Sequence, residues 1–454
     1  MIYDTAIIGA GPAGMMAAIS AVINSQKDKS TRPEIILIEK NKNPGKKLLL
    51  TGNGRCNYTT SVDLKTLVES FGRKGRFYYD AFADFSNKDT IDFFSSRGIT
   101  PRYENNKVFP ARGNSSDILN CLINEIKKYK IPVNTGCRVT EIKKASFNEI
   151  KSLFEISIKE ISIKNNYKTA KNPADKNKDI PNNISKKILS RKIIIATGGL
   201  SYPLTGSTGD GYRFASVFGH SVIKPAPSLV PLKLKRHDFK KLAGITLKNI
   251  KLSVYKHIDK ATGNSHSLKQ VKSTFGDILF THFGLSGPAA LEAGLSVHNL
   301  KSSGAGFSVV VDLIPDKEQD DIKNDLIINR SGKGLTGLLE TILPDIPKRF
   351  ILFLINQLGI SPDIKSSGLR RENISSITSL IKNFPVEVDG TCGFEKAVIT
   401  EGGIPVSEIN PKTMESRITE GLYFAGEIIE LAGPEGGYNL QKAFSTGWLA
   451  GKSI

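Results

Sequence analysis

The sequence predicts an α/β protein whose discontinuous Rossmann-like domain is built from both ends of the chain. A short apolar strand at residues 4–8 runs into a glycine-rich turn and then into an apolar helix. A second apolar strand follows at 34–38, which is the order that a dinucleotide fold requires. Near the C-terminus, an apolar strand at 421–425 is again followed by glycine turns and an Ala-rich helix. This C-terminal segment is therefore expected to rejoin the N-terminal sheet.

The first turn, at residues 9–14, has the GxGxxG spacing of a dinucleotide-binding turn. Gly9 permits the tight turn, Gly11 lets the backbone approach a pyrophosphate, and Gly14 lets the helix pack closely on the strand. The free N–H groups at the start of that helix would face the phosphates. Glu39 ends the second strand, where an acidic residue suits the hydroxyls of an adenosine ribose. The alternative for Glu39 is a solvated strand end.

A polar loop at 43–57 follows the second strand, and its glycines predict a close approach to a ligand. Beyond it, the apolar periodicity predicts three helices, over 62–71, 78–97 and 115–128. Strands are expected at 131–134, 138–144, 153–163 and 187–196, and the last three would form a β-meander on the parallel sheet. A long Lys/Asn-rich hairpin loop is expected at 164–185. A second close approach to a ligand is expected at Thr197-Gly198-Gly199, followed by a helix at 212–218.

From about residue 222 the pattern changes to short alternating strands, at 229–234, 250–255 and 307–313, which predict a second, β-rich domain. Residues 274–288 form a dense motif within it. The pattern then becomes helical until about residue 384, and a strand returns at 385–388. The predicted domains are a first part of the cofactor domain, a β-rich insert, a helical insert, a return strand and the rest of the cofactor domain, at 1–215, 216–314, 315–384, 385–395 and 396–454.

The composition limits the class of protein. With 454 residues the chain can hold two or three domains. Sixty-three Lys and Arg against 44 Asp and Glu give a net charge of +19. Such an excess can attract a polyanion such as RNA, or it can reflect a bias toward Lys, Asn and Ile throughout the chain. No apolar run reaches the roughly 18 residues that span a bilayer, and no basic leader precedes the first strand. A cytoplasmic protein that does not enter membranes is expected.

The four cysteines are Cys56, Cys121, Cys137 and Cys392, and their spacing is not that of a metal site. Scattered cysteines of this kind suit a reducing compartment, and no structural metal is expected.

Several long motifs occur together in one order, at 51–57, 206–212, 280–288, 413–416 and 436–439. In this combination the chain resembles the HI0933-like (YhiN/BaiN-like) family of bacterial NAD(P)/FAD-dependent flavoprotein oxidoreductases. The resemblance covers nearly the whole chain. It implies a discontinuous FAD-binding domain, an inserted β-barrel-like domain and a small helical domain. The chain departs from the family at Asn106-Lys107, where members often carry Gly-Arg before the Val-Phe-Pro element.

The resemblance implies FAD as the cofactor and NAD(P)H as a transient reductant. No second GxGxxG follows a strand, so a separate nicotinamide domain is not expected. The N-terminus of the last helix is expected to face flavin N1 and the C2 carbonyl and to favour negative charge there. The predicted cofactor-binding residues are Gly9, Gly11, Pro12, Ala13, Gly14, Glu39, Lys40, Lys47, Gly54, Arg55, Cys56, Asn57, Thr197, Gly198, Gly199, Gly426, Glu427, Gly437, Tyr438 and Asn439.

Two residues are candidates for catalysis. Cys56 would lie beside the flavin as a proton donor or redox partner, but a small buried packing residue is the favoured alternative. His282 would be a general acid or would orient the substrate, and its alternative is a hydrogen-bonded structural histidine. Arg55 would bind phosphate or a substrate anion, or else form an ion pair that stabilises its loop.

Three functions are consistent with these features. The favoured one is an NAD(P)H-dependent reductase that converts a uridine of ribosomal RNA to dihydrouridine, as the family association and the net charge suggest. The second is a flavin oxidase or reductase of a small aminoketone or enone. The third is a flavin-containing RNA-binding factor without turnover.

Overall fold

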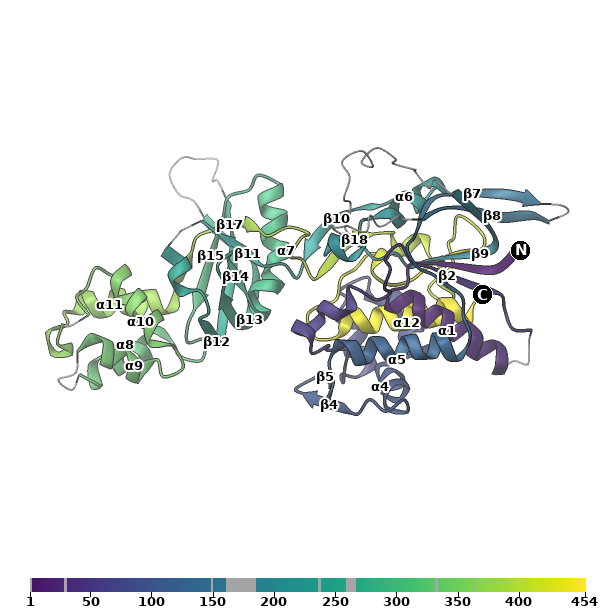
Figure 1. Cartoon of the computed structure of the whole chain (residues 1–454). Helices are drawn as coiled ribbons and strands as arrows, with labels where there is room; N and C mark the ends of the chain where they lie inside the picture. The colour runs from purple at the N-terminus through teal and green to yellow at the C-terminus, as the bar shows by residue number, and fades with distance from the viewer. Residues whose placement is uncertain are drawn as a thin grey trace, which may run out of the picture. The chain divides into compact units, whose positions relative to one another are not determined.

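The structure is a computed structural model. The structure describes residues 2–27, 31–147, 150–160, 185–235, 238–258, 267–330, 334–362 and 364–454. The Lys/Asn-rich loop expected at 164–185 lies outside these residues, apart from Ser185. The chain forms two compact units (Figure 1), one of Met1–Pro225 with Ile399–Ile454 and one of Ala226–Val398.

The first unit is built on a sheet whose parallel strands come from both ends of the chain. Strands β6 (Val133–Asn134), β2 (Ile35–Ile38), β1 (Ile2–Ile8) and β9 (Ser185–Ile195) lie in this order. The C-terminal strand β19 (Leu422–Phe424) pairs in parallel with the end of β9, with Leu422 opposite Ile193. The earlier part of β9 pairs with β8 (Ile150–Glu160), and β8 pairs with β7 (Cys137–Phe147), both antiparallel. The predicted discontinuous Rossmann-like sheet with its β-meander is confirmed.

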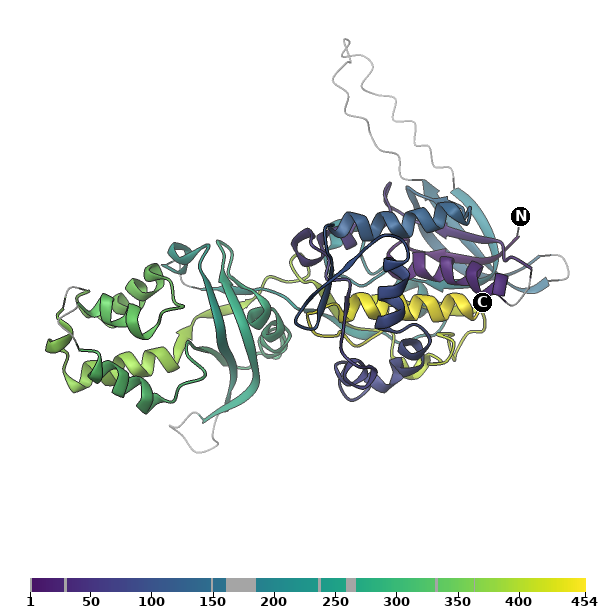
Figure 2. The ribbon, with the colours of Figure 1, turned by 90° about the horizontal axis from the view of Figure 1, so that it is seen from below.

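Three helices pack side by side in this unit: α1 (Pro12–Lys27), α5 (Ser115–Lys128) and α12 (Tyr438–Lys452), as Figures 1 and 2 show. Strand β2 is buried along its whole length, as expected for a parallel strand covered on both faces. Helix α5 begins where the sequence predicts, because Asn114 and Asp117 form a capping box at its first turn. Helices α1 and α12 pack through small residues, so the first and last helices of the chain support each other.

The prediction of one helix over 78–97 is wrong. The structure has α3 (Tyr79–Asp84) and α4 (Asn87–Ser95), separated at Ser86. Ser86 caps α4, since its hydroxyl accepts from the Asp89 amide while the Asp89 carboxylate accepts from the Ser86 amide. Helix α2 (Leu64–Glu69) is shorter than predicted because Asp63 caps it. A small antiparallel sheet of β3 (Thr59–Thr60), β5 (Lys107–Pro110) and β4 (Pro101–Glu104) completes this region.

The second unit is a mostly antiparallel sheet with helices. Its strand order is β16 (Phe384–Val386), β15 (Phe307–Asp312), β12 (Thr246–Ile258), β13 (Ser267–Phe280), β14 (Leu285–Ser286), β11 (Leu232–Leu234) and β17 (Val388–Thr391). The first and last strands of this order are joined in the chain by Glu387 alone, so the sheet must curve back on itself. Such curvature is typical of a barrel.

Sequence patterning missed part of this unit. The predicted strand 229–234 is only β11, since Leu229 has a φ of 47° and breaks the extended run. The dense motif 274–288 was not assigned to strands, yet it contains the end of β13 and all of β14. Helix α7 (Pro288–Ser302) was not predicted either, because its buried face is made largely of Ala and Gly rather than of large apolar residues. Helices α8 (Gln319–Ile328), α9 (Leu335–Ile342), α10 (Lys348–Gln357) and α11 (Arg371–Lys382) fill the predicted helical stretch.

Candidate functional site

The three glycines of the first turn differ in why glycine is needed at each position. A Cβ on Gly9, whose φ is 102°, would lie 2.5 Å from the Ala196 carbonyl oxygen, and one on Gly14 would lie 1.9 Å from the Gly9 carbonyl oxygen. Both positions must therefore be glycine for the strand–turn–helix unit to close. Gly11 differs, because a Cβ there would meet no described atom within 4 Å. The protein's own packing does not require glycine at this position, whereas a pyrophosphate lying against the backbone would.

Glu39 binds the glycine turn directly. Its Oε2 accepts from the Ala10 amide at 2.9 Å, and its Oε1 accepts from the Asn41 amide and from Asn41 Nδ2, each at 2.8 Å. The side chain is buried, so the alternative of a solvated strand end is wrong. A carboxylate can accept about four hydrogen bonds, so capacity remains beside the turn for ribose hydroxyls.

The loop after the second strand is tied to the Gly-rich segment before α6 (Asp210–Val217). Lys40 Nζ lies 2.7 Å from Asp210 Oδ2, and Arg138 Nη2 lies 3.0 Å from Asp210 Oδ1. Burial alone would raise the pKa of Asp210, but its hydrogen bonds to the two cations lower that pKa to about 2. Asn41 Nδ2 also donates to the Thr205 carbonyl oxygen at 2.9 Å. Lys40 therefore holds the segment that follows β2 against the start of α6.

Glu427 is the centre of a second cross-link. Its Oε1 accepts from Ser201 Oγ at 2.6 Å and from the Thr400 amide at 2.9 Å, while its Oε2 pairs with Lys47. Burial by itself would raise the pKa of Glu427, but the charge and hydrogen bond of Lys47 and the other donors lower it below its usual value. The carboxylate is thus ionised and joins three separate segments. Sequence reasoning identified Lys47 and Glu427 but missed Ser201 and Thr400.

The C-terminal glycines bring the end of the chain onto the same site. A Cβ on Gly426, whose φ is 81°, would lie 2.8 Å from the Ala13 side chain. A Cβ on Gly437, whose φ is 91°, would lie 2.4 Å from the Thr59 carbonyl oxygen. Tyr438 is the first residue of α12, and the side chain of Asn439 bonds both the amide and the carbonyl of Gly433 at 2.8 Å. The N-terminus of α12 is therefore held against β3, and Gly426 of the preceding segment is held against the start of α1.

In the Arg55-Cys56-Asn57 segment, Cys56 and Asn57 are buried whereas Arg55 is exposed. Cys56 has a φ of 57° and is fully buried, and this burial raises the pKa of its thiol to about 12 although a hydrogen bond with Thr51 opposes it. A thiol in this state stays protonated at neutral pH, which suits a packing residue and not a thiolate nucleophile. Gly54, with a φ of 89°, would place a Cβ near no described atom.

Two buried polar atoms of the predicted site have no hydrogen-bond partner among the described residues, Asn57 Nδ2 and Thr197 Oγ1. Asn57 uses its other side-chain atom, Oδ1, to accept from the Val108 amide at 3.2 Å. Gly198, with a φ of 75°, follows Thr197, and a Cβ on Gly199 would lie 2.4 Å from Thr400 Oγ1. Orphaned buried polar groups are rare in native proteins. Together with the open space at Gly11, they fit the binding of a large polar cofactor along these loops.

His282 belongs to the second unit, so it is not part of the network just described. It follows β13 in a tight turn in which Thr281 Oγ1 donates to the Gly284 carbonyl oxygen at 2.8 Å. Its ring packs edge-on against Phe283, at 5.2 Å between centroids.

Lys442 is a buried residue that the sequence analysis missed. Its Nζ donates to the carbonyl oxygens of Ile429, Glu430 and Leu431, at 2.7, 3.2 and 2.9 Å. Burial lowers its pKa to about 8, although nearby carboxylates oppose the shift. A lysine among the small and apolar residues of the last helix was the signal that could have identified it. It fixes the segment that leads into the Gly433–Gly437 turn.

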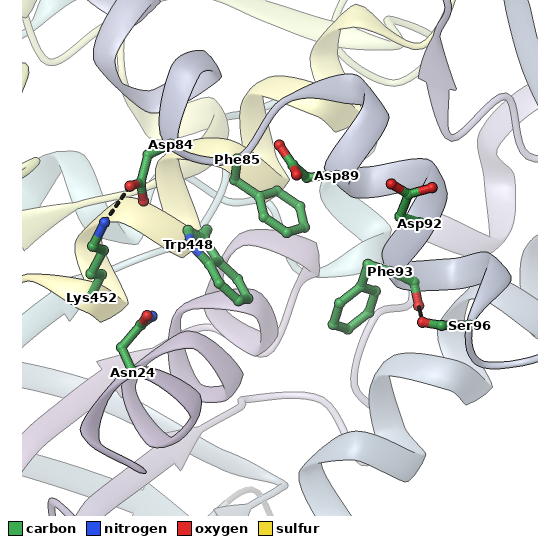
Figure 3. A pocket seen from close by; sticks show the side chains of 9 residues that line it. All are labelled: Asn24, Asp84, Phe85, Asp89, Asp92, Phe93, Ser96, Trp448 and Lys452. Atoms are coloured by element: carbon green, nitrogen blue, oxygen red, sulfur yellow. Dashed lines mark hydrogen bonds and ion pairs between the residues drawn. The ribbon is translucent and has the colours of Figure 1, made fainter. Parts of the chain in front are cut away.

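A separate pocket of about 450 Å³ lies elsewhere in the same unit (Figure 3). Phe85 stacks on Trp448, with 4.6 Å between ring centroids, and Asp84 pairs with Lys452. Because Asn24, Trp448 and Lys452 lie near the C-terminal ends of α1 and α12, this pocket is at the opposite end of those helices from the glycine turns. It is distinct from the candidate cofactor site.

The fold and the family match together define the chain as an FAD-dependent oxidoreductase. The family model described as "HI0933-like protein Rossmann domain" matches residues 3–453, and the chain belongs to this family. The predicted family membership is therefore confirmed.

Proteins of assigned activity resemble the chain over its whole length. It is 28% identical over 447 residues to the 3-dehydro-bile acid delta(4,6)-reductase of Clostridium scindens, covering 98% of each chain. It is 27% identical over 458 residues to the ribosomal RNA dihydrouridine synthase of Escherichia coli, covering 100% of this chain and 98% of that one. A flavocytochrome c3 fumarate reductase in its open conformation shares the fold, with 14% identity and a TM-score of 0.50 over 100% of this chain and 78% of that one.

Within the described parts of the chain, no helix is long and apolar enough to cross a membrane, and no group of three or more His, Cys, Asp or Glu side chains could hold a metal ion.

Proposed function

We propose that the chain is an NAD(P)H-dependent, FAD-containing reductase that converts a uridine of ribosomal RNA to dihydrouridine in the cytoplasm. The observation that carries the proposal is the combination of full-length similarity to proteins named ribosomal RNA dihydrouridine synthase, from Escherichia coli and Haemophilus influenzae, with a net charge of +19. A strongly basic chain suits a polyanionic substrate.

The reaction adds two hydrogens across the C5–C6 double bond of uracil, one as a hydride and one as a proton, and oxidises NAD(P)H. Bound FAD would supply the hydride-transfer chemistry. The residues of the chain bind FAD and orient it. The glycine turn and the N-terminus of α1 would hold the pyrophosphate, and Glu39 would bind the adenosine ribose. Lys47 and Glu427 keep the surrounding loops in register, and the N-terminus of α12 would favour negative charge at the pyrimidine end of the flavin.

Burial keeps the Cys56 thiol protonated at neutral pH. A thiol that burial keeps protonated is not a thiolate nucleophile, so Cys56 would form no covalent bond with the substrate. It stays a candidate proton donor or redox partner beside the flavin, with packing in the loop as the alternative. His282 stays a candidate proton donor of the second unit.

The second candidate function is reduction of a small molecule with a double bond conjugated to a carbonyl. It is favoured by the 28% identity over 98% of both chains to a protein named as a delta(4,6)-reductase of 3-dehydro-bile acids. Uracil and an enone present the same reacting group, a carbon–carbon double bond next to a carbonyl. The two candidates therefore share a cofactor site and differ in what recognises the rest of the substrate.

Mapping of modified nucleotides separates these functions. Deletion of the gene should remove one dihydrouridine from ribosomal RNA, and an unchanged map would eliminate the favoured proposal. An anaerobic NADPH titration with and without ribosomal RNA then tests the two other functions, the small-molecule reductase and the non-catalytic RNA-binding factor. Rapid reoxidation by an enone and not by RNA would support the second candidate, and failure of NAD(P)H to reduce the flavin in either condition would leave a non-catalytic RNA-binding factor.

A further inference from the structure

One face of the β4–β5 hairpin carries an unusual set of charges. Arg102 of β4 lies opposite Phe109 of β5, and Glu104 lies opposite Lys107. Residues directly opposite each other in an antiparallel pair point to the same face, and so do residues two apart in one strand. All four side chains therefore belong to one face of this two-stranded ribbon.

Two guanidinium groups converge on one carboxylate oxygen of this face. Arg102 Nη2 lies 3.0 Å from Glu104 Oε1, and Arg55 Nη2 pairs with the same oxygen. The Arg55 and Arg102 side chains are 56% and 59% exposed, and that of Glu104 is 30% exposed. Each guanidinium has five N–H donors, so most of this donor capacity is not used by Glu104.

The position of this cluster relates it to the candidate cofactor site. Arg55 comes from the loop that holds Cys56 and Asn57, and its guanidinium lies over the Phe109 ring, 4.4 Å from the centroid. Lys107 pairs with Glu435 of the turn before α12. The cluster therefore bridges two of the segments proposed to hold FAD. Three cations, Arg55, Arg102 and Lys107, face two carboxylates, Glu104 and Glu435, which leaves a net charge of one positive unit.

We propose that Arg55 and Arg102 form a phosphate-binding seat, which the Glu104 carboxylate fills when no ligand is bound. Guanidinium groups bind phosphate through two parallel hydrogen bonds, and their planar fork matches a phosphate as well as a carboxylate. Exposed ion pairs contribute little to stability, so an incoming phosphate can displace Glu104 at low cost. The Phe109 ring keeps the Arg55 guanidinium oriented during this exchange.

The inference rests on the proposed function for its two phosphate sources, the RNA backbone and the 2′-phosphate of NADPH. The experiment compares Arg102→Gln, which removes one guanidinium, with Glu104→Gln, which removes the internal competitor. Arg191→Gln is the matched control, because Arg191 forms a similarly exposed pair with Asp4, with side chains 51% and 46% exposed, away from the carboxyl edge of the sheet. Urea unfolding of each FAD-loaded variant verifies that the fold is intact.

The first arm measures binding of a single-stranded ribosomal RNA fragment by fluorescence anisotropy over a range of salt. If RNA supplies the phosphate, Arg102→Gln should weaken binding about fivefold and lower the slope of log K against log salt by about 0.7, as for loss of one phosphate contact. Glu104→Gln should tighten binding severalfold, and Arg191→Gln should leave it unchanged. The second arm measures KM for NADPH and NADH, and a change for NADPH alone would assign the seat to the 2′-phosphate.

Opposite effects of Arg102→Gln and Glu104→Gln on ligand binding distinguish the phosphate-binding seat from an ion pair that only stabilises the loop. Loss of such an ion pair would weaken binding in both variants. The inference would be overturned if every variant bound RNA, and separately NADPH, as tightly as the wild type does. It would also be overturned if Arg102→Gln and Glu104→Gln both weakened binding. If the variants do not differ while the gene still produces dihydrouridine, the seat is wrong and the proposed function stands. If the wild type binds no RNA and makes no dihydrouridine, the NADPH arm still tests the seat.

Discussion

Gly447 of α12 lies directly against Ala13 of α1, so that a Cβ on Gly447 would be 2.3 Å from the Ala13 carbonyl oxygen. One turn further along, a Cβ on Gly451 would be 2.1 Å from the Ala17 carbonyl oxygen. Ser20 Oγ also donates to the Trp448 carbonyl oxygen at 2.6 Å. The last helix of the chain therefore fixes the first one, whose N-terminus carries the candidate pyrophosphate cradle.

This contact predicts that Gly447→Ala lowers the free energy of unfolding. A methyl group cannot be accommodated at 2.3 Å from a backbone oxygen, so the two helices must separate, at a cost of about 2 kcal/mol, typical of overpacking. Urea unfolding followed by circular dichroism measures this loss. A variant as stable as the wild type would show that the two helices are not in close contact.

Gly11→Ala provides the matched contrast. A Cβ on Gly11 would meet no described atom, and its φ is not in the left-handed region, so alanine should leave the apoprotein as stable as the wild type to about 0.5 kcal/mol. FAD binding should nevertheless weaken at least tenfold, because the methyl group would occupy the space of the pyrophosphate. Titration of the apoprotein with FAD checks this. Normal FAD affinity in Gly11→Ala would remove Gly11 from the proposed cradle.

The sequence was sufficient to predict the elements that repeat a simple pattern. The strands at 4–8, 34–38 and 421–425 are short apolar runs next to glycine turns or an end-of-strand acid, and the helix at 115–128 has apolar residues at helical spacing. It was insufficient where small residues form the core, as in α7, or where a local cap interrupts a periodic run, as at Ser86.

The candidate site also contains some residues that the sequence predicts and others that only the tertiary fold brings in. Glycines and end-of-strand acids have fixed spacings, so Gly9, Gly14 and Glu39 could be found in the sequence. Thr400 and Ser201 could not, because they reach Glu427 only through the tertiary fold and carry no motif of their own. Lys442 was missed as well, because the last helix is predicted from its apolar and Ala residues, which give its polar residues no role.

The pair formed by Lys47 and Glu427 predicts a pH-dependent loss of stability. Lys47→Met should leave the Glu427 carboxylate buried without its cation and lower the free energy of unfolding by about 2 kcal/mol at pH 7. This is below the value for a fully buried pair, because the Lys47 side chain is 23% exposed. Lys186→Met, which breaks an exposed pair with Glu160, is the control and should cause no measurable change.

The sign of the pH effect follows from the direction of the pKa shift. In the wild type the pKa of Glu427 is lowered, so its contribution is present above the pKa of the unfolded chain and is lost as the pH falls through the folded pKa. In Lys47→Met the carboxyl should instead bind a proton readily. The stability difference between the two proteins should therefore shrink from pH 8 to pH 5. A difference that is constant over this range would mean that the Glu427 carboxyl of Lys47→Met takes up no proton between pH 8 and pH 5, which would contradict the prediction.

Cys56 should resist alkylation in the native protein. Its burial and raised pKa predict that iodoacetamide at pH 8 leaves Cys56 unmodified while the partly exposed Cys137 and Cys392 react, and that all three react in urea. Peptide mass spectrometry locates the label. Rapid modification of Cys56 in the native protein would show that the thiol is accessible and would favour a role as a redox partner over packing.

The central claim is that loops distant in the sequence form one FAD site, and FAD titration of the protein tests it most directly. The purified protein should show the absorption bands of a flavin, and apoprotein prepared from it should rebind one FAD per chain. A colourless protein that does not bind added FAD would contradict the account.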